Sequence, residues 1–283
     1  MNEQFLARMR ELLGPDYDAY VETLNNPPFR GLRANLLKIQ PDALVKRQFA
    51  SLSPSPFARE GFVLTGSETG LGNHIYHRQG LFYMQEPSAS SAVTILDPQP
   101  GDWVLDLCAA PGGKSTQIAA RIGQSGFLIA NEIDGGRARI LMSNLERLGV
   151  SEAMITHASP ERLCPQLGGW MDKVLVDAPC SGEGMFKKED RALADWSVEH
   201  VRACGQRQQK ILESAVFTLK EQGILVYSTC TYAPEENEQV IDQFLRKHPE
   251  MELIDCGVDF GRPGLSTGLV DGAKVRRCWS FPP

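Results

Sequence analysis

The chain has 283 residues, of which 42% are hydrophobic and 23% charged, and its formal net charge is -6 at pH 7. This composition is that of an ordinary globular protein, and the length allows one large domain or two small ones. No apolar run is long enough to cross a bilayer, and the first residues lack the order of a secretion signal. We therefore expect a cytoplasmic protein with no membrane partner.

The first elements in the chain are an amphipathic helix and a basic segment. Residues 1–14 predict a helix whose apolar face carries Phe5, Leu6, Met9, Leu12 and Leu13. Residues 27–60 combine six cations with two acids, namely Arg30, Arg33, Lys38, Lys46, Arg47 and Arg59 against Asp42 and Glu60. A solvated surface explains such a segment. Contact with nucleic-acid phosphates explains it too, although the acidic balance of the whole chain argues against that partner.

A second region begins after a stretch rich in proline, serine and glycine at residues 51–72, which is typical of a boundary. From residue 100 onward, strands are predicted at 102–108, 126–132, 153–158, 172–179 and 223–230. Helices are predicted at 114–123, 136–149, 199–220 and 234–248, with a further helix start at Ser159. The apolar stripe of the second helix is Ile140, Leu141, Leu145 and Leu148. This alternation predicts an α/β fold with a doubly wound, mostly parallel sheet. We expect a small α+β accessory region over residues 1–75 and the doubly wound domain over 76–283.

The stretch VLDLCAAPGGKST, which begins at residue 104, resembles a phosphate-binding loop with one glycine missing. Before Gly113 and Lys114, that motif needs a first glycine at the position of Cys108, so a nucleotide triphosphatase is the weaker interpretation. At the carboxyl ends of parallel strands, Gly112 lets the backbone approach a ligand, and Glu132 can accept hydrogen bonds from ribose hydroxyls. Taken alone, Glu132 has a weaker alternative interpretation as a surface acid beside a helix N-terminus. An adenosine-bearing cofactor without a triphosphate fits both features, and S-adenosyl-L-methionine is the candidate.

The seven cysteines show no spacing typical of disulfides or metal sites. Their number is odd, no two have CxxC spacing, and His74 and His77 have no further ligands nearby, so we expect no metal. Cys180 follows the fourth predicted strand and Cys230 the fifth, and neighbouring strands would place both thiols at one cleft beside Asp177. One cysteine at a strand end is ordinarily inert packing, whereas two beside a cofactor loop favour chemistry.

Two thiols beside a methyl donor fit one reaction in particular. Carbon 5 of cytosine is too weak a nucleophile to take a methyl group directly, but a thiolate that adds to carbon 6 makes carbon 5 enamine-like. A carboxyl group near the N3 edge would stabilise the adduct, and a second thiol could serve its release. The base must leave its stack, so loops and single strands are better substrates than a regular duplex.

Five motifs carry a resemblance to a known family: RGLRANLLK, GLFYMQEPSAS, DLCAAPGGK, DAPCSGEGMF and YSTCTYAPEENE. Between residues 28 and 238 the chain resembles the NOP2/Sun (RsmB/RsmF) family of RNA 5-methylcytosine methyltransferases, and most of all its bacterial RsmF-type 16S rRNA enzymes. The resemblance implies a Rossmann-like class I methyltransferase. It also implies methylation of cytosine carbon 5 in ribosomal RNA through a covalent adduct between cysteine and carbon 6.

The resemblance also implies roles for individual residues. Cys230 corresponds to the nucleophile and Cys180 to the cysteine that assists product release. The cofactor-binding residues that it implies are Cys108, Ala109, Ala110, Pro111, Gly112, Gly113, Lys114, Glu132, Arg137, Ser159 and Asp177. Lys114 is alternatively placed near the reacting centre, and Ser159 is either a helix N-cap or a cofactor contact. The reversed assignment of the thiols resembles the DNA cytosine-5 methyltransferases, whose nucleophile follows a proline, as Cys180 follows Pro179.

The partner implied by the resemblance is ribosomal RNA, alone or within the small ribosomal subunit, with residues 1–75 as an RNA-binding region. We expect a monomer, because nothing in the sequence demands a dimer. Relatives carry further strands where this chain ends with RRCWSFPP, so we expect the last strands of the sheet to be missing or altered. Transfer RNA is the alternative substrate, and a catalytically silent RNA-binding module is the alternative function.

Overall fold

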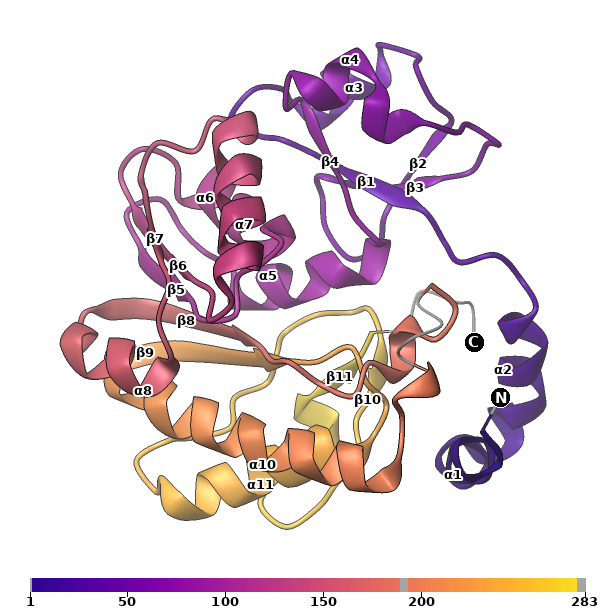
Figure 1. Ribbon diagram of the computed structural model, residues 1–283, viewed down its shortest axis with the longest axis vertical. Coiled ribbons are helices and arrows are strands. Elements are labelled where there is room, and N and C mark those ends of the chain that lie inside the picture. Colours follow the sequence, from indigo (N-terminus) through magenta and orange to yellow (C-terminus); the bar gives the residue numbers. More distant parts are fainter. Residues whose placement is uncertain (1, 189–192, 279–283) are drawn as a thin grey trace.

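The computed structural model describes residues 2–188 and 193–278, and two sheets with their helices make up most of it (Figure 1). The N-terminal sheet is antiparallel, with the strand order β2-β3-β1-β4. The N-terminal elements are α1 (Glu3–Leu13), a 3₁₀ turn at Gly14–Asp16, α2 (Tyr17–Leu24), β1 (Gly31–Ala34), α3 (Pro41–Val45), β2 (Leu52–Pro54), β3 (Gly61–Leu64), a 3₁₀ turn at Leu71–Asn73, α4 (Ile75–Arg78), β4 (Phe82–Met84) and a 3₁₀ turn at Pro87–Ser90. Because β4 pairs with β1, the small sheet extends past residue 75, where the sequence predicts the boundary.

The first two helices pack away from the small sheet and beside the C-terminal part, as Figure 1 shows. Phe5, Met9 and Leu13 of α1 are buried there, which confirms the predicted apolar face of this helix. The ring of Phe5 lies 4.9 Å from that of Phe186 and 5.6 Å from that of Trp196, both from the segment that follows β8. The N-terminus therefore supports a loop of the larger domain.

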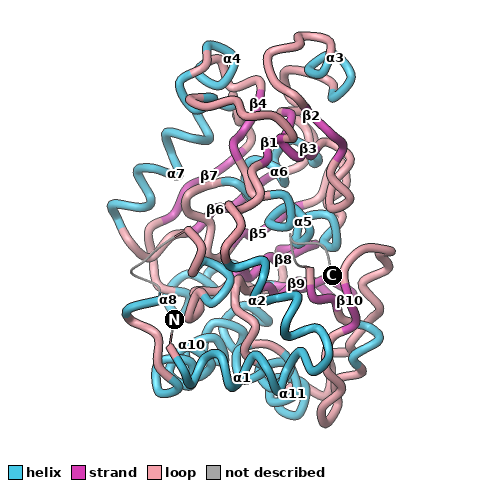
Figure 2. Tube along the Cα trace, turned by 90° about the vertical axis from the view of Figure 1, so that its right-hand side faces the viewer, coloured by secondary structure: helices cyan, strands magenta, loops and turns pink. Residues whose placement is uncertain are grey.

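The C-terminal part is a parallel five-stranded sheet in the order β7-β6-β5-β8-β9 (Figure 2). Its elements are α5 (Ser91–Leu96), β5 (Trp103–Asp106), α6 (Gly113–Ile122), β6 (Phe127–Asn131), α7 (Gly135–Leu148), β7 (Ala153–Thr156), α8 (Pro160–Leu163), β8 (Met171–Asp177), α10 (Val198–Ala215), β9 (Leu219–Ser228), α11 (Glu238–Lys247), β10 (Arg262–Pro263) and β11 (Arg276–Arg277). 3₁₀ turns occur at Cys164–Leu167, Glu183–Met185, Val216–Thr218, Pro234–Glu236 and Gly272–Lys274. This architecture confirms the predicted α/β class. The strand order reverses between β5 and β8, which is where ligands bind in such sheets.

Helices cover both faces of the large sheet, and alternate residues of the strands point to opposite faces. In β8, Val174 and Val176 pack with α10 and α11, whereas Leu175 packs with α5, α6 and α7. The period of two that strand geometry imposes therefore divides the core into two layers. Both layers are apolar because a parallel sheet is buried on both faces.

Two local predictions are wrong. Ile140 is 53% exposed, because the apolar stripe of α7 runs through Leu141, Leu145 and Leu148 at helical spacing and Ile140 lies beside it. The helix predicted to reach residue 220 ends at Ala215, and β9 begins at Leu219 rather than at residue 223. The start of β9 is polar, so the hydrophobic pattern of the sequence did not reveal this part of the strand.

The described C-terminal segment ends in a two-stranded antiparallel pair of β10 and β11. Across residues 2–188 and 193–278, the large sheet has five strands. The expectation of missing last strands concerns a stretch that ends at Pro283, which lies outside the described residues. No helix in the described part of the chain is both long and apolar enough to span a membrane.

Candidate active site

Two thiols lie together at the carboxyl ends of neighbouring strands. Cys180 follows β8 and Cys230 follows β9, and these strands pair in parallel as far as Asp177 opposite Ser228. The two sulfur atoms are 3.2 Å apart, which is hydrogen-bond distance for thiols. The structure thus brings both cysteines and Asp177 to one place, as the strand ends predict.

The pair is electrostatically unequal. The hydrogen bond from the Cys180 thiol lowers the pKa of Cys230 below its ordinary value, and the nearby Lys114 ammonium acts in the same direction. The same hydrogen bond, together with burial, raises the pKa of Cys180 well above its ordinary value. Cys230 is therefore the thiol that ionises first, with Cys180 as its donor.

Lys114 reaches the strand ends from the first turn of α6. Its Nζ lies 2.6 Å from Oδ2 of Asp177, whose Oδ1 accepts a hydrogen bond of 2.8 Å from the hydroxyl of Ser228. Burial lowers the pKa of Lys114, but Asp177, Asp106 and Cys230 together raise it above its ordinary value, so the ammonium stays charged. Lys114 lies beside the thiols, as one of the two sequence interpretations places it.

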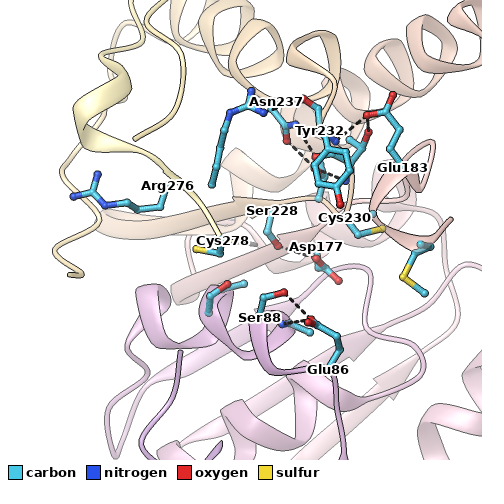
Figure 3. Close-up of a pocket in the computed structure, with 18 of the residues that line it drawn as sticks. Glu86, Ser88, Asp177, Glu183, Ser228, Cys230, Tyr232, Asn237, Arg276 and Cys278 are labelled. Atoms are coloured by element: carbon cyan, nitrogen blue, oxygen red, sulfur yellow. Dashed lines mark hydrogen bonds between the residues drawn. The ribbon is translucent and has the colours of Figure 1, made fainter. Parts of the chain in front are cut away.

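A cavity of about 560 Å³ opens at this point, and Lys114, Asp177 and Cys230 all line it (Figure 3). Glu86 and Ser88 line it from the turn before α5, and Tyr232 from the loop after β9. The cavity is large enough for a nucleobase and part of its sugar. Its walls combine apolar and polar groups, as ligand sites do.

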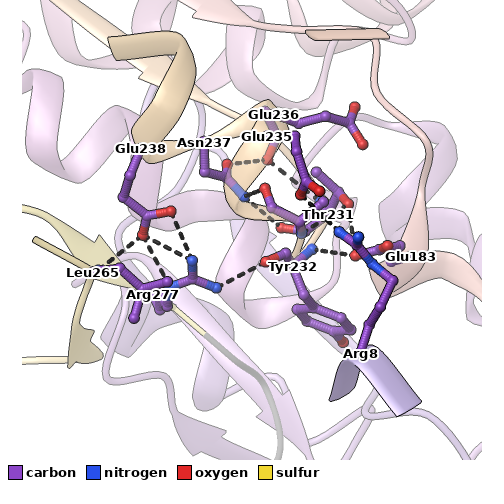
Figure 4. A network of polar contacts seen from close by, with 12 residues as sticks. Arg8, Glu183, Thr231, Tyr232, Glu235, Glu236, Asn237, Glu238, Leu265 and Arg277 are labelled. Atoms are coloured by element: carbon purple, nitrogen blue, oxygen red, sulfur yellow. Dashed lines mark hydrogen bonds and ion pairs between the residues drawn. The ribbon is translucent and has the colours of Figure 1, made fainter. Parts of the chain in front are cut away.

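Two buried glutamates, which the sequence analysis did not single out, fasten the two cysteine loops to each other. Glu183, from the Cys180 loop, accepts hydrogen bonds of 2.9 Å from the Thr231 hydroxyl and from the backbone N–H of Tyr232 (Figure 4). Glu236, which follows the Cys230 loop, accepts one of 2.9 Å from the backbone N–H of Ser181. Each loop is held by the acid of the other. Both acids lie in the quoted motifs, but only their partners in space reveal this function.

Both ends of the described chain contact the Cys230 loop as well. Arg8 of α1 pairs with Glu235 at 2.6 Å, and Arg277 of β11 donates to the carbonyl of Tyr232 at 2.9 Å (Figure 4). Arg277 also pairs with Glu238 at 2.7 Å, and both side chains are largely buried. The loop that carries Cys230 is therefore braced from three directions.

The glycine loop between β5 and α6 is held by side chains that bind its carbonyls. Arg137 donates to the carbonyl of Ala110 at 2.9 Å, and Asn144 donates to that of Pro111 at 2.8 Å. Gly112 has φ +108°, which favours glycine. A Cβ at Gly113 would lie 3.2 Å from the ring of Tyr83, so close packing within the protein also favours glycine at this position.

Glu132 and Ile133 follow β6 and have opposite environments. Glu132 is 2% exposed, accepts a hydrogen bond from the backbone of Asp134 at 2.9 Å and lies 3.5 Å from Arg137. Ile133 is 62% exposed. An exposed apolar side chain beside a strand-end carboxylate fits an adenosine, because the carboxylate can bind ribose and the isoleucine can cover the base. The sequence analysis missed Ile133, since nothing in the pattern shows that it is exposed.

The remaining predicted residues lie close to this region. Burial raises the pKa of Cys108 above its ordinary value, and its side chain packs against the apolar layer of Val174 and Val176, so this thiol is an inert packing group. Ser159 stands at the start of α8, but its side chain accepts no capping hydrogen bond. Among the described residues, no three His, Cys, Asp or Glu side chains gather as a metal site would require.

The basic segment does not form a single surface. Arg30 donates to the carbonyl of Glu68 at an exposed position, whereas Arg33 is 1% exposed. The interpretation of Arg33 as a phosphate contact is therefore wrong, because its buried guanidinium binds Gln85 and the beginning of α6.

Comparison with known proteins identifies the family of the chain. The model of the 16S rRNA methyltransferase RsmB/F family matches residues 93–268, and that of the N-terminal domain of 16S rRNA methyltransferase RsmF matches residues 1–87. The chain belongs to the RsmB/F methyltransferase family. The match to the N-terminal model ends at residue 87 and the match to the RsmB/F model begins at residue 93, shortly after the end of β4.

Relatives of this RsmB/F family member include the ribosomal RNA small subunit methyltransferase F of Pectobacterium carotovorum. That protein is 37% identical over 99% of this chain and 63% of its own length. The enzyme of the same name from an Enterobacter strain is 39% identical over 88% of this chain and 54% of its own. The chain thus spans between half and two thirds of the length of these curated relatives. A solved structure of a methyltransferase homologue from Pyrococcus horikoshii covers 97% of this chain and 88% of its own, with a TM-score of 0.85 and 33% identity.

Proposed function

We propose that this family member transfers a methyl group from S-adenosyl-L-methionine to carbon 5 of a cytosine in small-subunit ribosomal RNA. The observation that carries the proposal is the pair of thiols 3.2 Å apart, with the pKa of Cys230 lowered, beside Lys114 and Asp177. The names of its relatives support ribosomal RNA as the substrate class.

The residues around the glycine loop fit the cofactor. Glu132 would hold the ribose, Ile133 would cover the adenine, and the loop from Cys108 to Lys114 would hold the methionine part. When bound, the cofactor supplies a methyl group on a positively charged sulfur. Arg137 and Asn144 keep the loop in place through its carbonyls.

The thiols divide the remaining work. The thiolate of Cys230 adds to carbon 6, and the electron pair of the carbon 5–carbon 6 double bond becomes available at carbon 5 for the methyl group. The Lys114 ammonium can stabilise the negative charge that moves into the ring, and Asp177, 2.6 Å from that ammonium, would hold it in position. The carbon 5 proton then leaves, the sulfur–carbon 6 bond breaks and the double bond returns.

Cys180 suits the second half of this sequence. The hydrogen bond to the Cys230 sulfur is the largest cause of its raised pKa. Once that sulfur is bonded to carbon, this cause disappears, so the Cys180 thiol can release its proton to solvent. The resulting Cys180 thiolate can then accept the carbon 5 proton, and the thiol formed in this way donates its hydrogen bond to the Cys230 thiolate as that sulfur leaves carbon 6.

The test is tritiated methyl transfer to ribosomal and transfer RNA, with adduct detection by denaturing electrophoresis. Cys230→Ala should abolish both label and adduct, whereas Cys180→Ala should transfer the methyl group and remain as a trapped adduct. An adduct trapped in Cys230→Ala would reverse the assignment of the two thiols. Label in transfer RNA alone would overturn the substrate, and RNA binding without any label would indicate a silent RNA-binding module.

A further inference from the structure

Three side chains of the basic motif RGLRANLLK, at residues 30–38, contact the methyltransferase domain, two of them from buried positions and Lys38 from an exposed one. Arg33 lies in β1, Asn35 follows this strand, and Lys38 lies in the turn after it. Arg33 and Asn35 are fully buried or nearly so. All three side chains cross from the N-terminal sheet to helices of the methyltransferase domain.

Arg33 binds the beginning of α6. Its Nη2 donates to the carbonyl of Gly113 at 2.9 Å and to the hydroxyl of Thr116 at 2.7 Å, while its Nε donates to Gln85 at 2.9 Å. Gly113 immediately precedes Lys114, whose ammonium reaches Asp177. A displacement of Arg33 would therefore move Lys114 relative to the thiols.

Asn35 and Lys38 bind the end of α7. The amide of Asn35 donates to the carbonyl of Leu148 at 2.8 Å, and the ammonium of Lys38 donates to that of Arg147 at 2.9 Å. Both are terminal carbonyls of the helix, which need donors and carry its negative dipole end. Arg147 returns the contact by donating to the carbonyl of His77 at 2.7 Å.

These contacts converge on the glycine loop. α7 holds the loop through Arg137 and Asn144, and Arg33 holds it through the carbonyl of Gly113. We propose that Arg33, Asn35 and Lys38 are positioning residues that clamp α6 and α7 and so set the affinity of the loop for its cofactor. This inference rests on the proposed role of the loop in binding S-adenosyl-L-methionine.

The test separates a clamp from a phosphate contact with two matched variants. Lys38→Met and Lys46→Met remove the same charge from the same segment at two exposed positions. The Lys38 ammonium donates to the carbonyls of Gln79 and Arg147, and Lys46→Met leaves both of these contacts in place. Calorimetric titration with S-adenosyl-L-methionine should give a Kd about ten-fold higher for Lys38→Met and unchanged for Lys46→Met. Lys38→Arg should restore the affinity, because it can donate to the same carbonyls.

Binding of a ribosomal RNA fragment over a range of salt concentrations gives the opposite readout. Lys38→Met should leave the salt slope unchanged, whereas loss of a phosphate contact would reduce it by about one. An unchanged cofactor Kd together with a reduced slope for Lys38→Met would overturn the clamp. Arg33→Gln should weaken cofactor binding in the same way, and Lys38→Met answers the question even where Arg33→Gln does not fold.

A ligand-free measurement keeps the clamp separate from the proposed function. The rate at which iodoacetamide alkylates Cys230 reports how close Lys114 lies, and Lys38→Met should lower it relative to Lys46→Met. If the wild-type protein bound no S-adenosyl-L-methionine but this difference remained, the proposed cofactor would be wrong and the clamp would stand. Equal alkylation rates together with equal cofactor affinities would refute the clamp itself.

Discussion

Replacement of Glu183 by glutamine tests whether the two cysteine loops depend on this buried carboxylate. Glu183 is 3% exposed and accepts three hydrogen bonds of 2.9 Å, from the indole N–H of Trp196, the Thr231 hydroxyl and the Tyr232 backbone. A glutamine has one acceptor oxygen in place of two. Whichever way its amide is turned, a buried N–H of Trp196 or Tyr232 then faces another N–H.

The magnitude follows from these contacts. A hydrogen bond to a charged group contributes about 1.5–3 kcal/mol, and a buried donor without an acceptor costs about 1–3 kcal/mol. Relaxation of the loop recovers part of this sum, so we expect Glu183→Gln to lower the free energy of unfolding by about 3 kcal/mol. Because the loop carries Cys230, methyl transfer should fall by about ten-fold or more, since small misplacements of reacting groups are costly.

Urea unfolding and single-turnover methyl transfer measure the two effects. Glu221→Gln is the matched control, because Glu221 is exposed at the start of β9. An unfolding free energy within about 0.5 kcal/mol of wild type, the ordinary range for surface substitutions, would refute the reasoning for Glu183→Gln.

Three further changes have defined outcomes. Lys114→Met should raise the pKa of Cys230, because the ammonium helps to lower it, and the pH profile of iodoacetamide alkylation should shift to higher pH; an unshifted profile would contradict this. Burial raises the pKa of Asp106 to about 7 from 3.8, so its contribution to stability is lost as pH rises through this window. Asp106→Asn should therefore stabilise the protein more at pH 8 than at pH 4, by up to about 4 kcal/mol in urea unfolding, and an equal gain at both pH values would be inconsistent with the raised pKa. Gly80→Ala should lower the Tm far more than Gly70→Ala, because both have positive φ but only at Gly80 would the new Cβ collide with the last turn of α7; equal losses would show that the contact yields.

The large sheet and its strand ends were predictable because their signals are local. Each strand of the parallel sheet contains apolar residues in a short run, and the carboxyl ends of such strands meet by topology. Cys180, Cys230 and Asp177 could therefore be placed together before their distances were known. The exposed position of Ile140 was not predictable to the residue, since it lies at the margin of the apolar stripe of α7.

Contacts between segments that are distant in the chain could not be predicted from the sequence pattern. Arg33 and Lys38 look like surface cations in a basic segment, and only the approach of α6 and α7 shows that they bind backbone carbonyls. Glu183 and Glu236 likewise stand in acidic motifs that give no sign of burial. A charge pattern records what a residue can bind, but its partner is set by the tertiary fold.

The crossed glutamates have a consequence for motion. The backbone N–H groups of Ser181 and Tyr232 are bonded to the side chains of Glu236 and Glu183, outside the ladder of the sheet. Their exchange with deuterated solvent therefore reports separation of the two loops rather than fraying of β8 or β9. Each of these hydrogen bonds crosses from one loop to the other. Neither amide can therefore reach solvent unless a hydrogen bond between the two loops breaks. The two amides should consequently exchange at matched rates, and the loops should open as one unit while the strands beneath them remain paired.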